Sequence, residues 1–203
     1  MAALRARAVL LTGSNRGIGL ELVKQLLGGS RPPAWIFATC RDPEGPRAQE
    51  LRDLASRHPN LVLVKLDVAD PSAITDAVKV VEGKLNGAGL NLLINNAGVY
   101  APVTLETVDS EEMIRTYKTN AVGPLLMAQA ALNMLTKCQA LTYGETGILC
   151  VALHPGWVKT DMGTQEADLT VDTSVRGLLS VLPILSEKHS GSLLNWEGKV
   201  IPW

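Results

Sequence analysis

The residues best suited to chemistry in this sequence form a glycine-rich turn near the N-terminus. Three glycines follow the apolar run of residues 8–12 and precede a segment with helical periodicity. Glycine permits unusual backbone dihedral angles and close approach of a pyrophosphate, and the next helix offers unpaired N–H groups. The turn therefore predicts a dinucleotide site, although a purely structural turn explains such a motif equally well when it stands alone. The predicted contacts are Gly13, Ser14, Asn15, Arg16, Gly17, Ile18 and Gly19.

Two arginines indicate which dinucleotide the turn would favour. Arg41 comes just after the second apolar run, residues 34–39, where an acidic residue would accept the ribose hydroxyls of NAD. A guanidinium at that position suits a 2′-phosphate, and Arg16 inside the turn can reach the same phosphate. We therefore expect NADP(H) to be favoured over NAD(H). The alternative for either arginine is a solvated surface charge.

Polar residues also end the third and fourth apolar runs. Asp67 and Val68 could hold the adenine edge, and their alternative role is to begin the polar loop that leads to Asp70. At the end of the fourth apolar run, two carboxamide side chains and a glycine can bridge neighbouring strands and line the cofactor. Because the carboxyl ends of parallel strands form one edge of a sheet, these groups are expected to lie near the glycine turn. The second set comprises Asn95, Asn96, Ala97 and Gly98.

Short apolar runs alternate with longer segments of helical periodicity, which is typical of an α/β fold with a parallel sheet and crossover helices. Asp70 with Pro71 predicts one helix start, and Asp109 or Ser110 predicts another. Helix-favouring sequence then continues over residues 111–143 without a strand, whereas a mean helix has roughly a dozen residues. Strands are predicted at residues 8–12, 34–39, 61–66, 90–95, 148–153 and 193–196, and a last helix at residues 173–188 is interrupted at Pro183.

Composition excludes several classes of partner. The 203 residues are 46% hydrophobic, which is enough for one core and predicts a single domain over residues 1–203. A net charge of −1 with no basic run argues against nucleic acid and acidic membranes, and leaves a small molecule as the expected partner. No apolar run has membrane-spanning length. Cys40, Cys138 and Cys150 lack C-x-x-C spacing, so we expect no metal site, reduced thiols and a cytoplasmic protein.

Together, residues 12–19, residues 95–98 and Asn120 resemble a short-chain dehydrogenase/reductase. The stretches at residues 120–125, 154–162 and 195–203 are similar to the C-factor-like, sniffer-like carbonyl reductase branch. The resemblance covers essentially the whole chain. It implies a Rossmann-type doubly wound sheet, NADPH, and hydride transfer to a ketone or aldehyde. It also implies contacts on the nicotinamide side from Pro155, Gly156, Val158 and Thr160.

The chain departs from that family at the catalytic groups. In the family an Asn, matched here by Asn120, supports a proton-relay water, a Ser polarises the carbonyl, and a Tyr with a Lys four residues later donates the proton. None of the tyrosines has such a lysine: Tyr100, Tyr117 and Tyr143 are followed at that spacing by Thr104, Ala121 and Gly147. Of the catalytic set only Asn120 remains. His154, or Tyr143 with Lys137, could replace the donor, but packing roles explain these residues more simply.

The absence of these catalytic residues can be traced to one position in the sequence. Similar proteins separate a segment like residues 124–129 from a segment like residues 130–137 by a fifth strand with its Ser and by the start of the Tyr-x-x-x-Lys helix. Here the two segments abut. We predict an internal deletion joined near Gln129 and Ala130, about thirty to forty residues and one βα unit in size, as alternative splicing would produce.

That deletion has consequences for the sheet and for activity. The strand at residues 148–153 must pair directly beside the fourth strand or leave an unpaired gap. We therefore expect reduced stability and impaired or absent catalysis. The alternative is a non-enzymatic or regulatory isoform that pairs with a full-length reductase. A homo-oligomer is the other assembly we consider.

Overall fold

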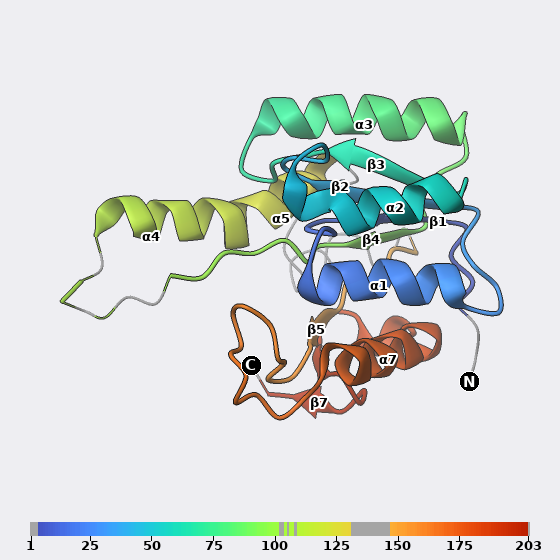
Figure 1. The fold of residues 1–203 in the computed structure, drawn as a ribbon. Coiled ribbons are helices and arrows are strands. Elements are labelled where there is room, and N and C mark those ends of the chain that lie inside the picture. The colour runs from blue at the N-terminus through green and yellow to red at the C-terminus, as the bar shows by residue number, and fades with distance from the viewer. Residues whose placement is uncertain (1–3, 102–103, 105, 108, 131–146, 203) are drawn as a thin grey trace.

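The first four strands form one parallel sheet in the structure, which is a computed structural model (Figure 1). It describes residues 4–101, 104, 106–107, 109–130 and 147–202. The strands are β1 (Ala8–Leu11), β2 (Trp35–Cys40), β3 (Leu61–Lys65) and β4 (Leu92–Ile94), in the order β3-β2-β1-β4. In the centre, Val9 of β1 lies beside Ile36 on one side and Leu92 on the other. The predicted α/β fold with a Rossmann-type parallel sheet is confirmed.

Helices cover both faces of this sheet because successive β1 side chains point to opposite sides. Val9 and Leu11 join the core that contains Val175, whereas Leu10 joins the core that contains Met127. The first core is covered by α1 (Gly17–Gly28), α2 (Gln49–Arg57) and α7 (Val171–Val181). The second is covered by α3 (Pro71–Leu85) and α5 (Gly123–Ala130).

Helix starts follow the predicted capping residues. The Asp70 side chain accepts a hydrogen bond from the backbone N–H of Ser72, with Pro71 as the first residue of α3. Asp109, and not Ser110, caps α4 (Ser110–Tyr117) by accepting from Glu112 N–H. The long predicted helix is interrupted by a π-helix (Lys118–Val122) before α5. Its remainder, residues 131–143, lies outside the described residues.

The C-terminal strands form a second sheet, in the order β5-β6-β7. It consists of β5 (Ala152–His154), β6 (Leu193–Asn195) and β7 (Val200–Ile201). The predicted strand at 148–153 is thus corrected to 152–154, because its extent is set by pairing with the three residues of β6. The strand β7 was not predicted; its two residues are too few to show a pattern. Within the described ranges, β4 pairs only with β1 and β5 only with β6.

The last helical region begins earlier and ends earlier than predicted. Thr170 caps α7 by accepting a hydrogen bond from Thr173 N–H, so the helix starts at Val171. It ends at Val181, just before Pro183, and the chain continues in the 3₁₀ turns Leu182–Ile184 and Glu187–His189. The predicted interruption at Pro183 therefore ends the α-helix, as the missing N–H of proline requires.

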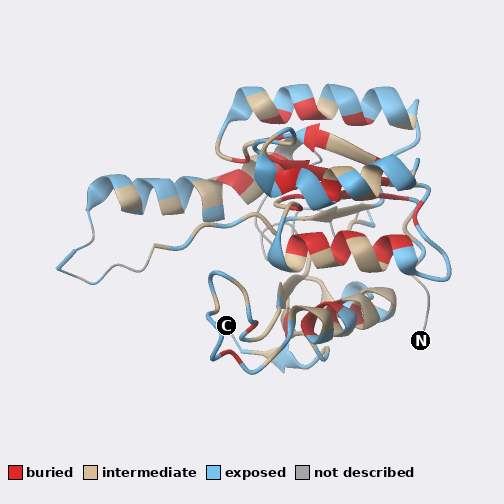
Figure 2. Ribbon diagram, viewed as in Figure 1, coloured by how far each residue is buried: buried red, intermediate tan, exposed pale blue. Residues whose placement is uncertain are grey.

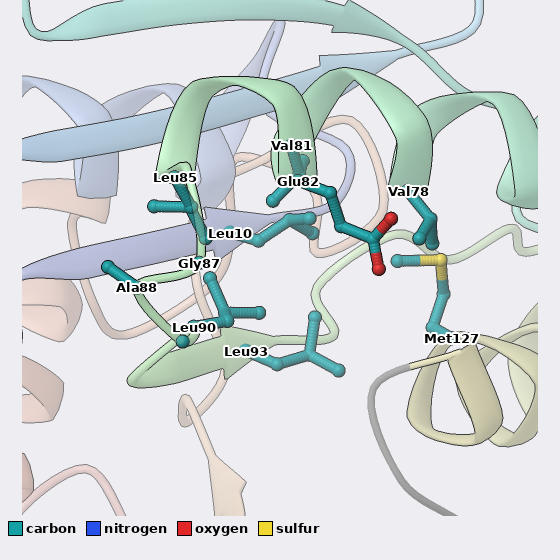
Figure 3. A pocket seen from close by; sticks show the side chains of 11 residues that line it. Leu10, Val78, Val81, Glu82, Leu85, Gly87, Ala88, Leu90, Leu93 and Met127 are labelled. Atoms are coloured by element: carbon teal, nitrogen blue, oxygen red, sulfur yellow. The ribbon is translucent and has the colours of Figure 1, made fainter.

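A cavity of about 630 Å³ lies between α3, α5 and the edge strand β4 (Figure 3). Figure 3 shows Leu10, Leu93 and Met127 around it, with the Glu82 carboxylate at its side. It opens on a face of the sheet, whereas ligands of open α/β sheets bind at the carboxyl ends of the strands. We therefore do not assign this cavity to the cofactor site. None of the helices in the described part of the chain is long and apolar enough to cross a membrane.

Candidate cofactor site

The glycine turn between β1 and α1 has the backbone geometry that glycine provides. Gly13 has φ of +67° and Gly17 has φ of +53°, which lie in the left-handed region that L side chains rarely adopt. A Cβ atom on Gly13 would lie 2.9 Å from the Cα of Ala97. A Cβ on Gly19 would overlap the carbonyl oxygen of Gly13 and crowd Asn96. The turn therefore packs tightly against the end of β4, and the N-terminus of α1 begins at Gly17.

Ser14 joins this turn to the end of β2 by hydrogen bonds. Its hydroxyl donates to the carbonyl of Leu11 (2.8 Å) and accepts from Thr39 N–H (3.2 Å), while Ser14 N–H donates to the carbonyl of Thr39 (2.9 Å). The side chain is fully buried. Ser14 was predicted among the cofactor contacts, and the structure gives its hydroxyl a positioning role.

Thr12 and Asn96 join the ends of β1 and β4. The Asn96 carboxamide donates to the carbonyls of Thr12 (2.9 Å) and Gly13 (3.0 Å). In return, the Thr12 hydroxyl accepts from the backbone N–H groups of Asn96 and Ala97, both at 3.0 Å. Sequence reasoning left Thr12 out of the site, although a hydroxyl directly before the first glycine could have drawn attention to it. Asn95, by contrast, is exposed and its side chain has no hydrogen bond to any described residue, so it remains available to a ligand.

Asn120 lies in the π-helix and holds the loop that follows β4. Its Oδ1 accepts from Val99 N–H and its Nδ2 donates to the Val99 carbonyl, each at 2.8 Å. The same oxygen lies 3.5 Å from where a Cβ of Gly98 would be. Both ends of the carboxamide are therefore occupied by backbone, and Asn120 positions the predicted contacts Ala97 and Gly98.

The two arginines that were predicted to bind a 2′-phosphate differ in their surroundings. Arg16 forms an exposed ion pair with Asp161, and its contact with a 2′-phosphate stays a prediction. Arg41 is exposed and makes no side-chain hydrogen bond or ion pair within the described residues. The side chain of Asn15 approaches the carbonyl of Arg47 at 3.5 Å, which brings a further guanidinium-bearing residue beside the turn. Arg47, in the 3₁₀ helix Pro46–Ala48, was not among the predicted contacts.

Asp67 and Val68 have structural partners. The Asp67 carboxylate accepts from Ala69 N–H at 2.9 Å, and the Asp67 carbonyl accepts from Asp70 N–H at 3.1 Å. Val68 is buried, and a Cβ on Gly123 would lie 3.0 Å from the Val68 carbonyl oxygen. These contacts support the alternative interpretation that the pair shapes the turn leading to α3. A cofactor contact from either residue stays a prediction.

The loop after β5 begins with a constrained turn. His154 Nδ1 accepts from Gly156 N–H at 3.0 Å, so the proton of the neutral ring belongs on Nε2. Gly156 has φ of +82°, and its missing side chain makes room for Leu169. The carbonyl of Pro155 accepts from the buried hydroxyl of Ser174 on α7 at 2.7 Å. This turn is anchored to α7.

The same loop then reaches the glycine turn. Val158 is buried, and the Thr160 hydroxyl accepts from Gly163 N–H at 3.1 Å. The methyl group of Thr160 would lie 3.6 Å from a Cβ on Gly17. The predicted phosphate and nicotinamide contacts are therefore neighbours, although they belong to different sheets.

No replacement for the proton donor is assembled within the described residues. Tyr100 and Tyr117 are exposed, and neither has a hydrogen-bonded lysine. Tyr143, Lys137 and Cys138 lie outside the described residues. Burial raises the pKa of the Cys40 thiol, an effect that a backbone hydrogen bond from Asp42 opposes, and burial also raises the pKa of the Cys150 thiol. A raised pKa favours the protonated thiol over the reactive thiolate. Across the described ranges, no group of His, Cys, Asp and Glu could hold a metal ion.

Comparison with known proteins decides the family. Residues 7–134, which include the glycine turn, all of β1 to β4, and Asn120, match the sequence profile of the short chain dehydrogenases. The chain belongs to the short-chain dehydrogenase family. The family resemblance predicted from the motifs is confirmed.

This short-chain dehydrogenase is similar to the solved structures of carbonyl reductases. It is 48% identical to the NADPH-bound carbonyl reductase from chicken fatty liver, with a TM-score of 0.94 over 98% of this chain and 100% of that chain. It is 33% identical to the carbonyl reductase Sniffer of D. melanogaster, with a TM-score of 0.92 over 97% and 99% of the two chains. The narrower resemblance to sniffer-like carbonyl reductases is confirmed.

A longer relative reveals a difference in length. The short-chain dehydrogenase srdF of Neurospora crassa is 25% identical over 256 aligned positions, with 100% of both chains covered. This alignment is 53 positions longer than the 203 residues of the present chain. At least that many aligned positions therefore have no counterpart here.

Proposed function

We propose that this carbonyl-reductase-type oxidoreductase binds NADP(H) in preference to NAD(H) and has little or no carbonyl reductase activity. The observation that carries the proposal is the contrast between two sets of residues. The glycine turn is held in place on both sides, by Ser14 toward β2 and by Asn96 toward β4. The sequence, however, contains no tyrosine with a lysine four residues later.

The cofactor preference rests on charge at the end of β2. Arg41 is exposed and unpaired within the described residues, and the carbonyl of Arg47, in the 3₁₀ helix Pro46–Ala48, lies beside Asn15. A guanidinium binds a phosphate through paired hydrogen bonds, whereas it offers no acceptor for the ribose hydroxyls of NAD. The chicken carbonyl reductase, which binds NADPH, supports the same assignment. The helix N-terminus at Gly17 would hold the pyrophosphate.

The proposed lack of activity follows from the proton that carbonyl reduction consumes. Hydride transfer from the nicotinamide to a carbonyl carbon leaves an alkoxide, and the alkoxide requires a proton. Bound NADPH supplies the hydride but not this proton. The remaining family residue, Asn120, carries a carboxamide that is not an acid and is already bonded to Val99 at both ends. The positioned donor is therefore missing.

The deletion near Gln129 and Ala130 is supported by length and by topology. The longer alignment with srdF leaves at least 53 positions without a counterpart, which exceeds the predicted thirty to forty residues but remains of the order of one βα unit with its connections. The expected alternatives were direct pairing of β5 beside β4 or an unpaired gap, and β4 and β5 lie in separate sheets. Both features agree with the loss of the strand that would lie between β4 and β5.

Cofactor binding can be tested by thermal unfolding with NADPH and with NADH. A ligand present at a hundred times its Kd stabilises the folded protein by about 2.7 kcal/mol. We expect NADPH to raise the melting temperature more than NADH does, and Arg41→Ala to remove the difference. Arg31→Ala, which changes an exposed arginine in the turn after α1, is the matched control. Equal shifts with the two cofactors would refute the preference, and no shift would refute the site.

Catalysis is a separate test, because a cofactor-loaded protein can still lack a proton donor. NADPH oxidation with a reactive small dicarbonyl is expected to stay at the rate without protein. Turnover proportional to protein concentration, and lost in His154→Gln or Tyr143→Phe, would show a rebuilt donor and would overturn the inactive assignment. The cytoplasmic location and the carbonyl substrate remain predictions.

A further inference from the structure

The cavity between α3, α5 and β4 has the size and the lining of a small-molecule site (Figure 3). Its volume is about 630 Å³, and ligand pockets in proteins measure about 300 to 1,000 Å³. Apolar side chains from separate elements form its walls, among them Val81 of α3, Leu93 of β4 and Met127 of α5. Such a lining favours an apolar body, since its burial removes apolar surface from water.

The cavity has a buried floor and an exposed mouth. Leu10, Val81 and Met127 are only 5%, 6% and 3% exposed. The loop of residues 87–89, which also lines the cavity, is exposed. A Cβ atom on Gly87 or on Gly89 would meet no other atom within 4 Å. A small molecule can therefore enter beside this loop and place its apolar part against the floor.

The mouth lies at the opposite end of the sheet from the glycine turn. Leu90, which lines the cavity, comes just before β4, whereas Asn96, which holds the glycine turn, comes just after it. The mouth is therefore at the amino end of β4 and the cofactor site is at its carboxyl end. A ligand in the cavity would leave the cofactor site free.

Two negative features lie at the mouth. Glu82 lines the cavity, is exposed, and forms no ion pair or side-chain hydrogen bond with a described residue. Helix α3 ends close by, where Asn86 takes left-handed dihedral angles and donates its N–H to the Glu82 carbonyl. The C-terminus of a helix carries a partial negative charge. Lys84, although on the same turn, does not line the cavity.

We propose that this cavity binds a small organic amine, with an aromatic or branched aliphatic body and one ammonium group. The body packs against Leu10, Leu93 and Met127, and the ammonium lies beside Glu82 at the end of α3. A carboxylic acid with the same body would bring a negative charge to the same place, so it is disfavoured. The charge at the mouth thus selects among ligands that the apolar floor alone would accept.

The expected selectivity is modest because Glu82 is exposed. A solvent-exposed ion pair and a helix terminus together favour the cation by about five- to tenfold over a neutral compound of the same shape. Most of the affinity comes from the apolar body. Binding requires neither NADPH nor catalysis, so its test does not depend on the proposed function.

The test compares three compounds that share one ring system, by isothermal titration calorimetry on the full chain without cofactor. They are 1-naphthylmethylamine, 1-naphthalenemethanol and 1-naphthaleneacetate. We expect the amine to bind most tightly and the acid most weakly. Glu82→Gln should lower the affinity for the amine to near that for the alcohol and leave the alcohol unchanged. Glu111→Gln, at an exposed glutamate of α4, is the matched control and should change neither.

A second pair of variants locates the binding. Val78→Trp places a large side chain into the cavity and should weaken the amine and the alcohol alike. Val80→Trp, at an exposed residue of α3 that does not line the cavity, should weaken neither. If Val78→Trp fails to fold, the exposed Glu82 variant still decides the question.

Three results would overturn the proposal. The first is no saturable binding of the amine, and the second is an amine affinity that Glu82→Gln leaves unchanged. The third is displacement of the amine by NADPH, which would assign the binding to the cofactor site. Failure of NADPH itself to bind would refute the proposed function and leave this inference standing.

Discussion

The sheet of β1 to β4 and the sheet of β5 to β7 differ in how completely they are packed. Val9, Leu11 and Ile36 are fully buried in the first, and the buried residues shown in Figure 2 are concentrated there and on α1. In the second sheet the strands have two or three residues, and Leu194 is the one strand residue classed as buried. The first sheet bears the glycine turn, and the proposed missing unit would join the second to it. Under our proposal, the glycine turn depends on the well-packed first sheet, whereas the missing catalytic residues belong to the unit between the two sheets.

The largest expected effect is a difference between two leucines. Leu11→Ala removes a fully buried side chain and should lower the free energy of unfolding by about 3 to 4 kcal/mol. Leu93→Ala removes a side chain that already borders the cavity beside β4, and should cost less than about 2 kcal/mol. Urea unfolding of both variants measures the difference. Equal losses would show that the edge of β4 is as well packed as the centre.

The second largest effect is expected as a difference in stability between variants of the adjacent residues Asn95 and Asn96. Asn96→Ala leaves the carbonyls of Thr12 and Gly13 without their donor, which should cost about 1 to 3 kcal/mol and weaken NADPH binding. Asn95→Ala should change stability by less than about 0.5 kcal/mol, because its side chain is exposed. Chemical unfolding with and without NADPH compares the variants. A larger loss of stability from Asn95 than from Asn96 would reverse our interpretation of the β4 end.

A smaller effect is expected where the two sheets meet. Arg16 and Asp161 are 52% and 81% exposed, so Asp161→Asn should change the free energy of unfolding by no more than about 0.5 kcal/mol. Because Arg16 is then free to reach a phosphate, NADPH should bind somewhat more tightly at low salt. Fluorescence titration of NADPH at two salt concentrations measures this. Weaker binding in the variant would show that the ion pair helps to form the site.

The smallest effect concerns pH. Burial raises the pKa of Cys40 above its ordinary value of 9.0, so folding favours the protonated thiol. This stabilisation is complete below the ordinary pKa and is lost as pH rises through the higher pKa of the folded protein. Stability should therefore fall on the alkaline side, and less so in Cys40→Ala. An identical alkaline profile for the variant would assign the fall to other groups.

The sequence could predict the first sheet because each signal there is local. Asp70 with Pro71 marks a helix start by capping chemistry alone, and the glycines mark a turn by their backbone freedom. The partners of Ser14 and Thr12 could not be predicted, since each hydrogen bond joins residues from separate strands. The motif therefore predicted the position of the site. It did not show which side chains are already hydrogen-bonded within the protein.

The second sheet was harder to predict because its strands are short and their extents depend on one another. The apolar run at 148–153 predicted a strand, yet pairing with β6 places it at 152–154. The ion pair of Arg16 with Asp161, in the loop after β5, was likewise not predictable from the residue pattern. Such contacts depend on how segments far apart in the chain come together, which a residue pattern does not contain.

The central claim is that a cofactor site persists without a proton donor, and the fate of bound NADPH tests it most directly. NADPH fluorescence should show saturable binding to the protein, and addition of a reactive dicarbonyl in excess should leave the bound NADPH unoxidised. Loss of the bound-cofactor signal, at a rate that rises with dicarbonyl concentration and yields the alcohol, would contradict the claim. Failure of NADPH to bind at any concentration would contradict it equally.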